Sequence, residues 1–191
     1  MSKPTAPASL SGANIVKERM LPTGVLEIGE SNAPLVLMVF TNYSCNYCEH
    51  FHQEQFPKLL EEFITPGKLR MQIIPIILKK YPESTPTLTA LSCAALEGKG
   101  VSMNEWLFQK KSHDQSSLLQ ATADLHLDTT LFQKCIESKE TQLAIEQLKQ
   151  IALSLSVELI PTFFLNGERF VGLQEYPDLR GRIVEALDSQ R

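Results

Sequence analysis

The sequence predicts an α/β fold interrupted by an all-helical insert. Strand-like runs with a helical pattern between them occur before residue 80, a second strand-like pair follows residue 160, and residues 81–156 contain no strand-like run. The first strand-helix-strand order implies a parallel pair joined by a right-handed crossover. We therefore expect a flexible leader over residues 1–24, a sheet domain built from 25–80 and 157–191, and a helical insert over 81–156.

In the first part of the chain, residues 24–29 alternate between glycines and predict a short edge strand. The run Leu35–Thr41 is apolar on both faces, as expected for a strand in the middle of a sheet. A helix is expected over residues 46–65, with a kink at Pro57, and a further strand over 68–78.

The second part of the chain is first helical and then returns to the sheet. Apolar residues at helical spacing predict helices over residues 87–97, 103–108, 118–125, 130–137 (with Asp128 as N-cap) and 140–155. The dipeptide Asn166-Gly167 separates two strand-like runs and predicts a hairpin. A final amphipathic helix is expected over 175–188.

Composition limits the class of protein. With 43% hydrophobic and 21% charged residues, the 191-residue chain can bury a core, and its formal net charge of -4 argues against a nucleic-acid binder. No run approaches about 18 apolar residues, so no membrane span is expected. The Pro-, Ser- and Ala-rich start lacks the apolar centre of a secretory signal. We expect that a signal or membrane anchor was removed and that the protein is periplasmic or otherwise extracytoplasmic, with the cytoplasm as the alternative.

The most informative motif is Cys45-Asn46-Tyr47-Cys48, at the junction of a predicted strand and a predicted helix. Unpaired N–H groups and the helix dipole stabilise a thiolate there, and the thiolate is the nucleophile in disulfide exchange. We expect Cys45 to be an exposed nucleophile with a pKa below the ~8.5 of an ordinary thiol. Cys48, one turn into the helix, is then the buried resolving thiol.

A zinc site is the main rival interpretation of the same segment. Cys45, Cys48 and His52 supply metal-binding atoms, and the last two are spaced i,i+4 on a helix. However, His50 points to another side, and no second cysteine-histidine pair has zinc-finger spacing. We predict no metal and no cofactor, and a partly exposed surface role for both histidines.

Two further cysteines lie in the predicted insert. Cys93 and Cys135 are each embedded in an apolar helical stripe, which by default makes them buried, inert thiols. The even cysteine count leaves open a structural disulfide between them that would brace the insert.

Residues 40–51 and 160–167 together resemble the DsbA-like branch of the thioredoxin superfamily. In that family an aromatic-rich strand leads into C-x-x-C, a helical domain interrupts the fold, and an x-Pro-Thr-aromatic strand leads to an Asn-Gly hairpin. The resemblance covers residues 25–188 and implies a thioredoxin-like fold with an inserted all-helical domain. It also implies that Pro161 is cis and faces the cysteines, that Ile160 pairs with a substrate peptide, and that Asn46 and Tyr47 contact substrate.

Two departures from the family bear on redox potential. The spacer is Asn46-Tyr47, where strong oxidants of the family often have Pro-His, and Val39 stands where many relatives bury an acid six residues before the first cysteine. Weaker stabilisation of the Cys45 thiolate favours the disulfide form. We therefore expect an intermediate potential.

The resemblance implies a protein thiol-disulfide oxidoreductase that donates its Cys45–Cys48 disulfide to secreted or periplasmic client proteins. A membrane quinone-linked thiol oxidase would reoxidise it. A reductase or isomerase of the same family is one alternative. The alternative from another class is a non-catalytic peptide-binding module whose cysteines are structural or zinc-bound.

Overall fold

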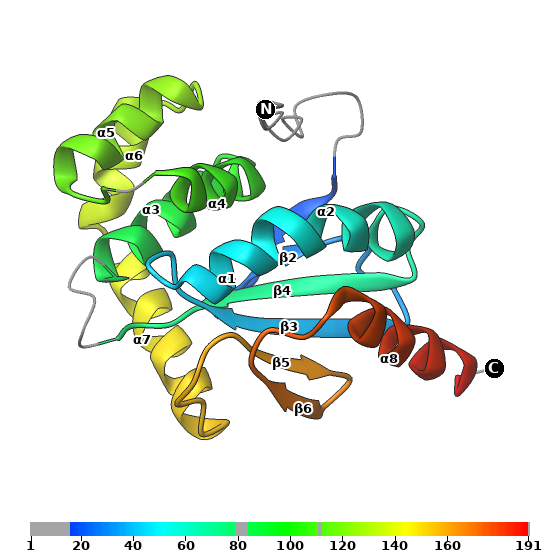
Figure 1. Ribbon diagram of the computed structural model, residues 1–191. Coiled ribbons are helices and arrows are strands. Elements are labelled where there is room, and N and C mark those ends of the chain that lie inside the picture. Colours follow the sequence, from blue (N-terminus) through cyan, green and yellow to red (C-terminus); the bar gives the residue numbers. More distant parts are fainter. Residues whose placement is uncertain (1–15, 79–83, 111, 191) are drawn as a thin grey trace, which may run out of the picture.

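The structure is a computed structural model that describes residues 16–78, 84–110 and 112–190. It contains a six-stranded sheet of order β1-β2-β4-β3-β5-β6, surrounded by helices (Figure 1). The strands are β1 (Glu18–Met20), β2 (Leu26–Ile28), β3 (Leu35–Thr41), β4 (Leu69–Pro75), β5 (Thr162–Leu165) and β6 (Glu168–Val171).

The centre of the sheet is the predicted parallel pair. β3 and β4 run parallel over their whole length, from Leu35 opposite Leu69 to Thr41 opposite Pro75. β5 pairs antiparallel with the other side of β3, and β5 and β6 form the predicted hairpin. The predicted α/β fold, with its central parallel pair and its hairpin, is confirmed.

Two expectations about the N-terminal part are wrong. The sheet begins at Glu18, inside the predicted leader, and β2 is an interior strand between β1 and β4, not an edge. The three-residue segment Glu-Arg-Met has no apolar alternation that marks a strand. Its position depends on a distant contact, because the Glu18 carboxylate accepts the backbone N–H groups of Gly100 and Val101 at 2.6 and 2.9 Å.

The helix that follows β3 is continuous but not regular. It consists of α1 (Asn46–His50), a π-helical turn η1 (Phe51–Gln55), α2 (Phe56–Leu59) and a second π-helical turn η2 (Leu60–Ile64). The interruptions therefore lie in π turns on both sides of α2, whose first turn contains Pro57. Such turns change which side chains share a face, and they occur frequently at functional sites.

Five helices lie between β4 and β5 and make up the insert, and a final helix follows β6. They are α3 (Ser84–Leu96), α4 (Gly100–Gln109), α5 (Gln115–Asp124), α6 (Thr129–Glu137), α7 (Lys139–Ser154) and α8 (Tyr176–Asp188). Asp128 caps α6 as predicted, since its carboxylate accepts the N–H groups of Thr130 and Leu131.

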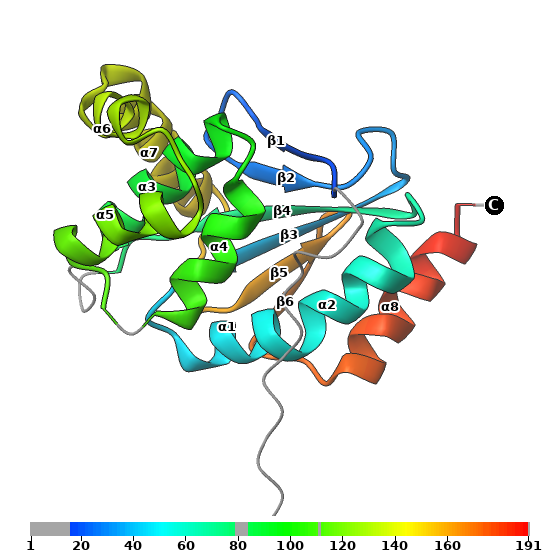
Figure 2. The same cartoon turned by 90° about the horizontal axis from the view of Figure 1, so that it is seen from above.

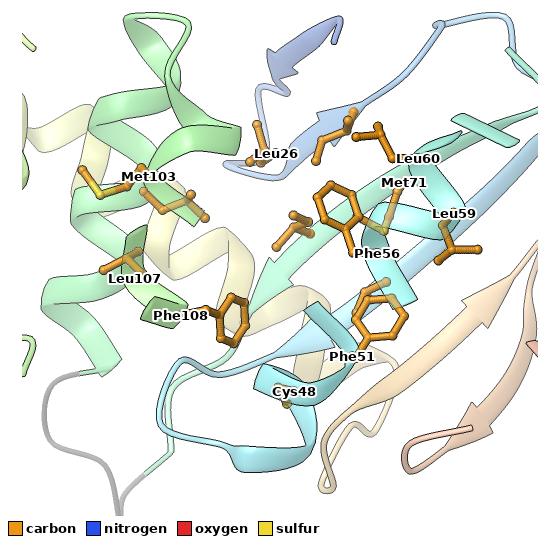
Figure 3. Packing of buried hydrophobic residues seen from close by; sticks show 14 of the residues in the cluster. Leu26, Cys48, Phe51, Phe56, Leu59, Leu60, Met71, Met103, Leu107 and Phe108 are labelled. Carbon is orange, nitrogen blue, oxygen red and sulfur yellow. The ribbon is translucent and has the colours of Figure 1, made fainter. Parts of the chain in front are cut away.

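The helices bury two cores, one on each face of the sheet. On one face, side chains of α1, α2 and α4 meet β3 and β4, and Figure 3 shows Phe56 of α2 and Phe108 of α4 within this cluster. On the other face, Ile145 and Leu148 of α7 pack with Phe40 of β3. The insert gathers at one end of the sheet, beside the start of α1 (Figure 2).

Candidate active site

Cys45 lies at the junction that the sequence predicts. It is the N-cap of α1, with extended backbone angles (φ -101°, ψ 116°). Its N–H donates to the carbonyl of Asn42 at 3.1 Å, and its own carbonyl accepts the N–H of Glu49 at 2.9 Å. Cys45 thus immediately precedes the first turn of α1, and Cys48 lies within that turn.

The expectation that Cys45 is exposed is wrong, because its side chain is only 8% exposed. It packs in the same apolar cluster as Cys48 and Phe163. The solvent-facing positions of the motif belong to the spacer, where Asn46 and Tyr47 are exposed and Tyr47 retains 66% of its accessible area.

Cys48 is the buried partner, as predicted, with 1% of its area exposed. Its pKa is raised above the usual range, first by a hydrogen bond with Cys45, then by burial and by the charge of Cys45. Hydrogen bonds from the Thr41 side chain and the Asn42 backbone oppose this shift. Cys48 is therefore held as a neutral thiol in direct contact with Cys45.

Val39, six residues before Cys45, is apolar where many relatives of the resembled family have an acid. It is buried and lines a cavity of about 10 Å³ together with Thr41, His52 and Asn104. The Thr41 hydroxyl is the polar side chain of this group that also reaches Cys48.

The expectation of a surface role is wrong for His52, although His50 is exposed as predicted. The His52 ring is 8% exposed and stacks between Phe56 and Phe108, with centroid distances of 5.3 and 4.6 Å. Burial lowers its pKa to about 4. A regular helix would place His52 on the Cys48 face, but the segment turns into a π helix at Phe51, and the imidazole Nδ1 lies 3.2 Å from Asn104 Nδ2 on α4.

The loop before Cys45 is fixed by contacts that the sequence analysis missed. The Asn42 amide donates to the Ile76 carbonyl and to the Ser84 hydroxyl, both at 2.9 Å, and its oxygen accepts the Ser44 N–H. The Tyr43 hydroxyl donates to Asn104 Oδ1 at 3.0 Å. The sequence signal for Asn104 was a polar residue within the apolar stripe of residues 103–108. The helical insert thus holds the active-site loop at both Asn42 and Tyr43.

The peptide bond between Ile160 and Pro161 is cis, as the resemblance implies. Phe40 of β3 is opposite Thr162 of β5, so extending this register places Pro161 beside the strand end that leads into the cysteine loop. The Gly172 N–H donates to the Pro161 carbonyl at 2.8 Å. Ile160 is partly exposed next to it.

Cys93 and Cys135 form a disulfide with a Cα–Cα distance of 5.7 Å. It connects α3 to α6 within the insert, and Cys93 is 1% exposed. The Thr141 hydroxyl of α7 lies 3.3 Å from the Cys135 sulfur. The bond thus joins two helices of the insert to each other.

Over residues 16–78, 84–110 and 112–190, no three His, Cys, Asp or Glu side chains gather as they would around a metal ion. In the same part of the chain, no helix combines the length and apolar character needed to cross a membrane.

Comparison with known proteins places the chain in a family. A family model described as thioredoxin matches residues 21–185. Disulfide bond formation protein D of Bacillus subtilis is 19% identical over 171 residues, which cover 84% of this chain and 76% of that protein. The probable disulfide bond formation protein D of Bacillus anthracis is 23% identical over 150 residues, or 73% of this chain and 69% of that one.

Solved structures share the fold. Oxidised BdbD from Bacillus subtilis superposes with a TM-score of 0.77 at 18% identity, covering 91% of this chain and 98% of that one. Alpha-DsbA1 from Wolbachia pipientis gives 0.76 at 20% identity, covering 85% and 90%. Like the described chain, this group combines a thioredoxin sheet with inserted helices. The chain belongs to the thioredoxin family and is a DsbA-like thiol-disulfide oxidoreductase.

Proposed function

We propose that this enzyme is a disulfide donor: it passes the Cys45–Cys48 disulfide to reduced client proteins in an extracytoplasmic compartment. The observation that carries the proposal is the contact between the two sulfurs at the start of α1, with the buried Cys48 held neutral beside Cys45. The names of the two Bacillus relatives, disulfide bond formation proteins, support the same direction of exchange.

The reaction needs two unequal sulfurs. A client thiolate attacks the Cys45 sulfur of the enzyme disulfide, forms a mixed disulfide and releases Cys48, which takes up a proton because burial disfavours its thiolate. A second client thiolate then attacks the client sulfur of the mixed disulfide and releases Cys45. The client loses two electrons and the enzyme gains them, so an oxidant must remove them before the next cycle, and we assign this role to a membrane quinone-linked thiol oxidase.

Client recognition is assigned to the surface around the exposed spacer. Tyr47 and Asn46 offer an aromatic and an amide side chain on one side, and Ile160 offers backbone groups beside Pro161 on the other. An extended client segment can pair with the Ile160 backbone as an added strand. The exposed Leu159 extends the apolar character of this surface.

Oxidative refolding of a reduced client protein tests the proposal. The oxidised enzyme should restore client activity, and Cys45→Ala and Cys48→Ala should both be inactive, because neither variant can form the disulfide that the client receives. Cys93→Ala/Cys135→Ala is the control, since both of the sulfurs that it removes lie outside the motif. A protein that reduces insulin but does not oxidise the client would instead be a reductase, and inactivity in both assays would point to a binding module.

A further inference from the structure

One fully buried polar side chain of the insert has no part in the exchange reaction described above. Asn104 is 0% exposed and lies on α4 between Met103 and Leu107, both of which belong to the apolar core. Burying an amide costs free energy unless its donors and acceptor are hydrogen-bonded. The partners of Asn104 therefore indicate why it stands there.

The two partners of Asn104 flank the cysteine motif. Its oxygen accepts the hydroxyl of Tyr43 at 3.0 Å, and its nitrogen lies 3.2 Å from Nδ1 of His52. Tyr43 is two residues before Cys45, and His52 is four residues after Cys48. A single amide thus connects the loop that enters the motif with the helix that leaves it.

The protonation states of Tyr43 and His52 fit the two hydrogen bonds of Asn104, in which Tyr43 donates to the amide oxygen and His52 accepts from the amide nitrogen. Burial raises the pKa of Tyr43 above its usual range, so the phenol keeps the proton that it donates. Burial lowers the pKa of His52 to about 4, so the ring is neutral near pH 7 and Nδ1 can accept from the amide. Phe108, also on α4, packs against both rings. Its ring centroid lies 4.7 Å from that of Tyr43 and 4.6 Å from that of His52.

We propose that Asn104 is a positioning residue for disulfide exchange: through it, the helical insert fixes the loop before Cys45 against the helix after Cys48. This inference rests on the proposed function, because the pair that it positions is the redox pair. The orientation of the loop determines how the first amides of α1 face the Cys45 sulfur, and those amides stabilise its thiolate. Loss of the connection should therefore weaken the Cys45 thiolate.

The test compares Asn104→Leu with Trp106→Phe. Asn104→Leu keeps a similar volume and removes both hydrogen bonds. Trp106→Phe is the control on the same helix, because it also loses one hydrogen bond, the part-buried bond from Nε1 to Asp124 of α5 at 2.8 Å, and this bond lies within the insert. Both variants are titrated by alkylation of Cys45 as a function of pH and equilibrated with a glutathione buffer.

For Asn104→Leu we expect the midpoint of Cys45 alkylation to move to higher pH and the equilibrium to shift about tenfold toward the disulfide, which is about 30 mV. Trp106→Phe should leave both values as in the wild type. An Asn104→Leu variant with wild-type values, or with the same shift as Trp106→Phe, would overturn the inference.

Tyr43→Phe supplies a second, milder test that does not depend on the folding of Asn104→Leu. It removes only the hydroxyl, so the alkylation midpoint should move in the same direction by less. In the double variant Tyr43→Phe/Asn104→Leu the shift should equal that of Asn104→Leu alone, because both changes act through one connection. Additive shifts, or no shift in Tyr43→Phe, would contradict the inference.

The alkylation midpoint does not require a client protein, and this separates the two proposals. If the wild-type enzyme fails to oxidise a client while Asn104→Leu still moves the midpoint, the disulfide-donor proposal fails and the positioning role stands. If the wild type oxidises clients and the midpoint does not move, only the positioning role fails.

Discussion

The chain contains two cysteine pairs whose surroundings differ in kind. Cys45 and Cys48 are two residues apart in the motif, both in the thiol form, at the start of a helix and beside exposed spacer residues. Cys93 and Cys135 are 42 positions apart and are joined across the interface of α3 and α6. The same chemical group thus serves reaction in one place and cross-linking in the other.

The two pairs differ in the chemical state that their surroundings favour for each sulfur. At the motif, burial and the Cys45 contact keep Cys48 neutral, and we propose that the helix start favours a thiolate on Cys45, so the two sulfurs are unequal. In the insert, Cys93 is fully buried among apolar side chains, and a long chain segment is closed by the bond. Reactivity therefore follows from asymmetry and position at a helix start, not from the presence of two nearby cysteines.

The largest expected effect is on disulfide transfer, which should depend on the motif cysteines and not on the insert pair. Cys45→Ala should abolish disulfide transfer to a reduced peptide, because the disulfide that is transferred cannot form without Cys45. Cys93→Ala/Cys135→Ala should retain transfer at temperatures where it is folded. Stopped-flow measurement of peptide oxidation gives both rates, and loss of transfer in the insert variant at such temperatures would show that the second pair also takes part in exchange.

Protein stability should depend more on the insert disulfide than on the two motif cysteines, which is the reverse of the order for activity. Removing the insert disulfide should lower the free energy of unfolding by about 2 to 4 kcal/mol, because the bond restricts the unfolded chain over a long loop. Cys45→Ala/Cys48→Ala is the control, since it removes two buried thiols and no cross-link. Urea denaturation compares them in a thiol-disulfide buffer that keeps the motif in the thiol form and leaves the insert disulfide intact. Equal losses would mean that the insert bond adds no cross-linking stability.

We expect the free energy of unfolding to depend on pH through His52, which lies on the helical run that contains Cys48. His52 has a pKa of about 4 in the folded state and about 6.5 when unfolded, so the unfolded chain binds the proton more readily. The contribution of His52 to the free energy of unfolding is complete above pH about 6.5. As the pH falls from there to about 4, the free energy of unfolding decreases by roughly 3 kcal/mol. Urea denaturation between pH 7 and 4 should show this slope.

His52→Phe keeps the ring stacking and removes the titrating group, so its stability should depend less on pH in that window. His50→Gln is the control, because His50 is exposed on the same helical run. An unchanged slope in His52→Phe would mean that the acid sensitivity comes from other groups.

The sequence predicted the parts of the molecule that depend on local pattern. The bounds of β3 agree with the prediction at both ends, because a buried central strand is a continuous apolar run. The cysteine motif, the hairpin at Asn166-Gly167 and the cis bond before Pro161 also carry local or family signals. What these share is that their neighbours in sequence determine their structure.

The features that were missed depend on contacts between distant segments. β1 is held by pairing with β2 and by the bonds from Glu18 to α4. The burial of His52 follows from a π turn and from Asn104, 52 positions away, and neither is visible as a periodic pattern. Cys45 is buried by the packing of the whole cluster, although its position at a strand-helix junction was predicted.

The smallest expected effect concerns the hydrogen bond between the Thr41 hydroxyl and Cys48. The Thr41 hydroxyl donates to Cys48 and partly offsets the rise in its pKa, so Thr41→Val should raise that pKa further. A hydrogen bond to an ionised group is worth about 1.5 kcal/mol, so attack by Cys48 on a mixed disulfide at Cys45 should slow roughly tenfold. Thr122→Val is the matched control, since that buried hydroxyl bonds the Leu119 carbonyl in the insert. Release of a labelled peptide from the mixed disulfide measures the rate, and equal rates in the two variants would leave burial and Cys45 alone to set the reactivity of Cys48.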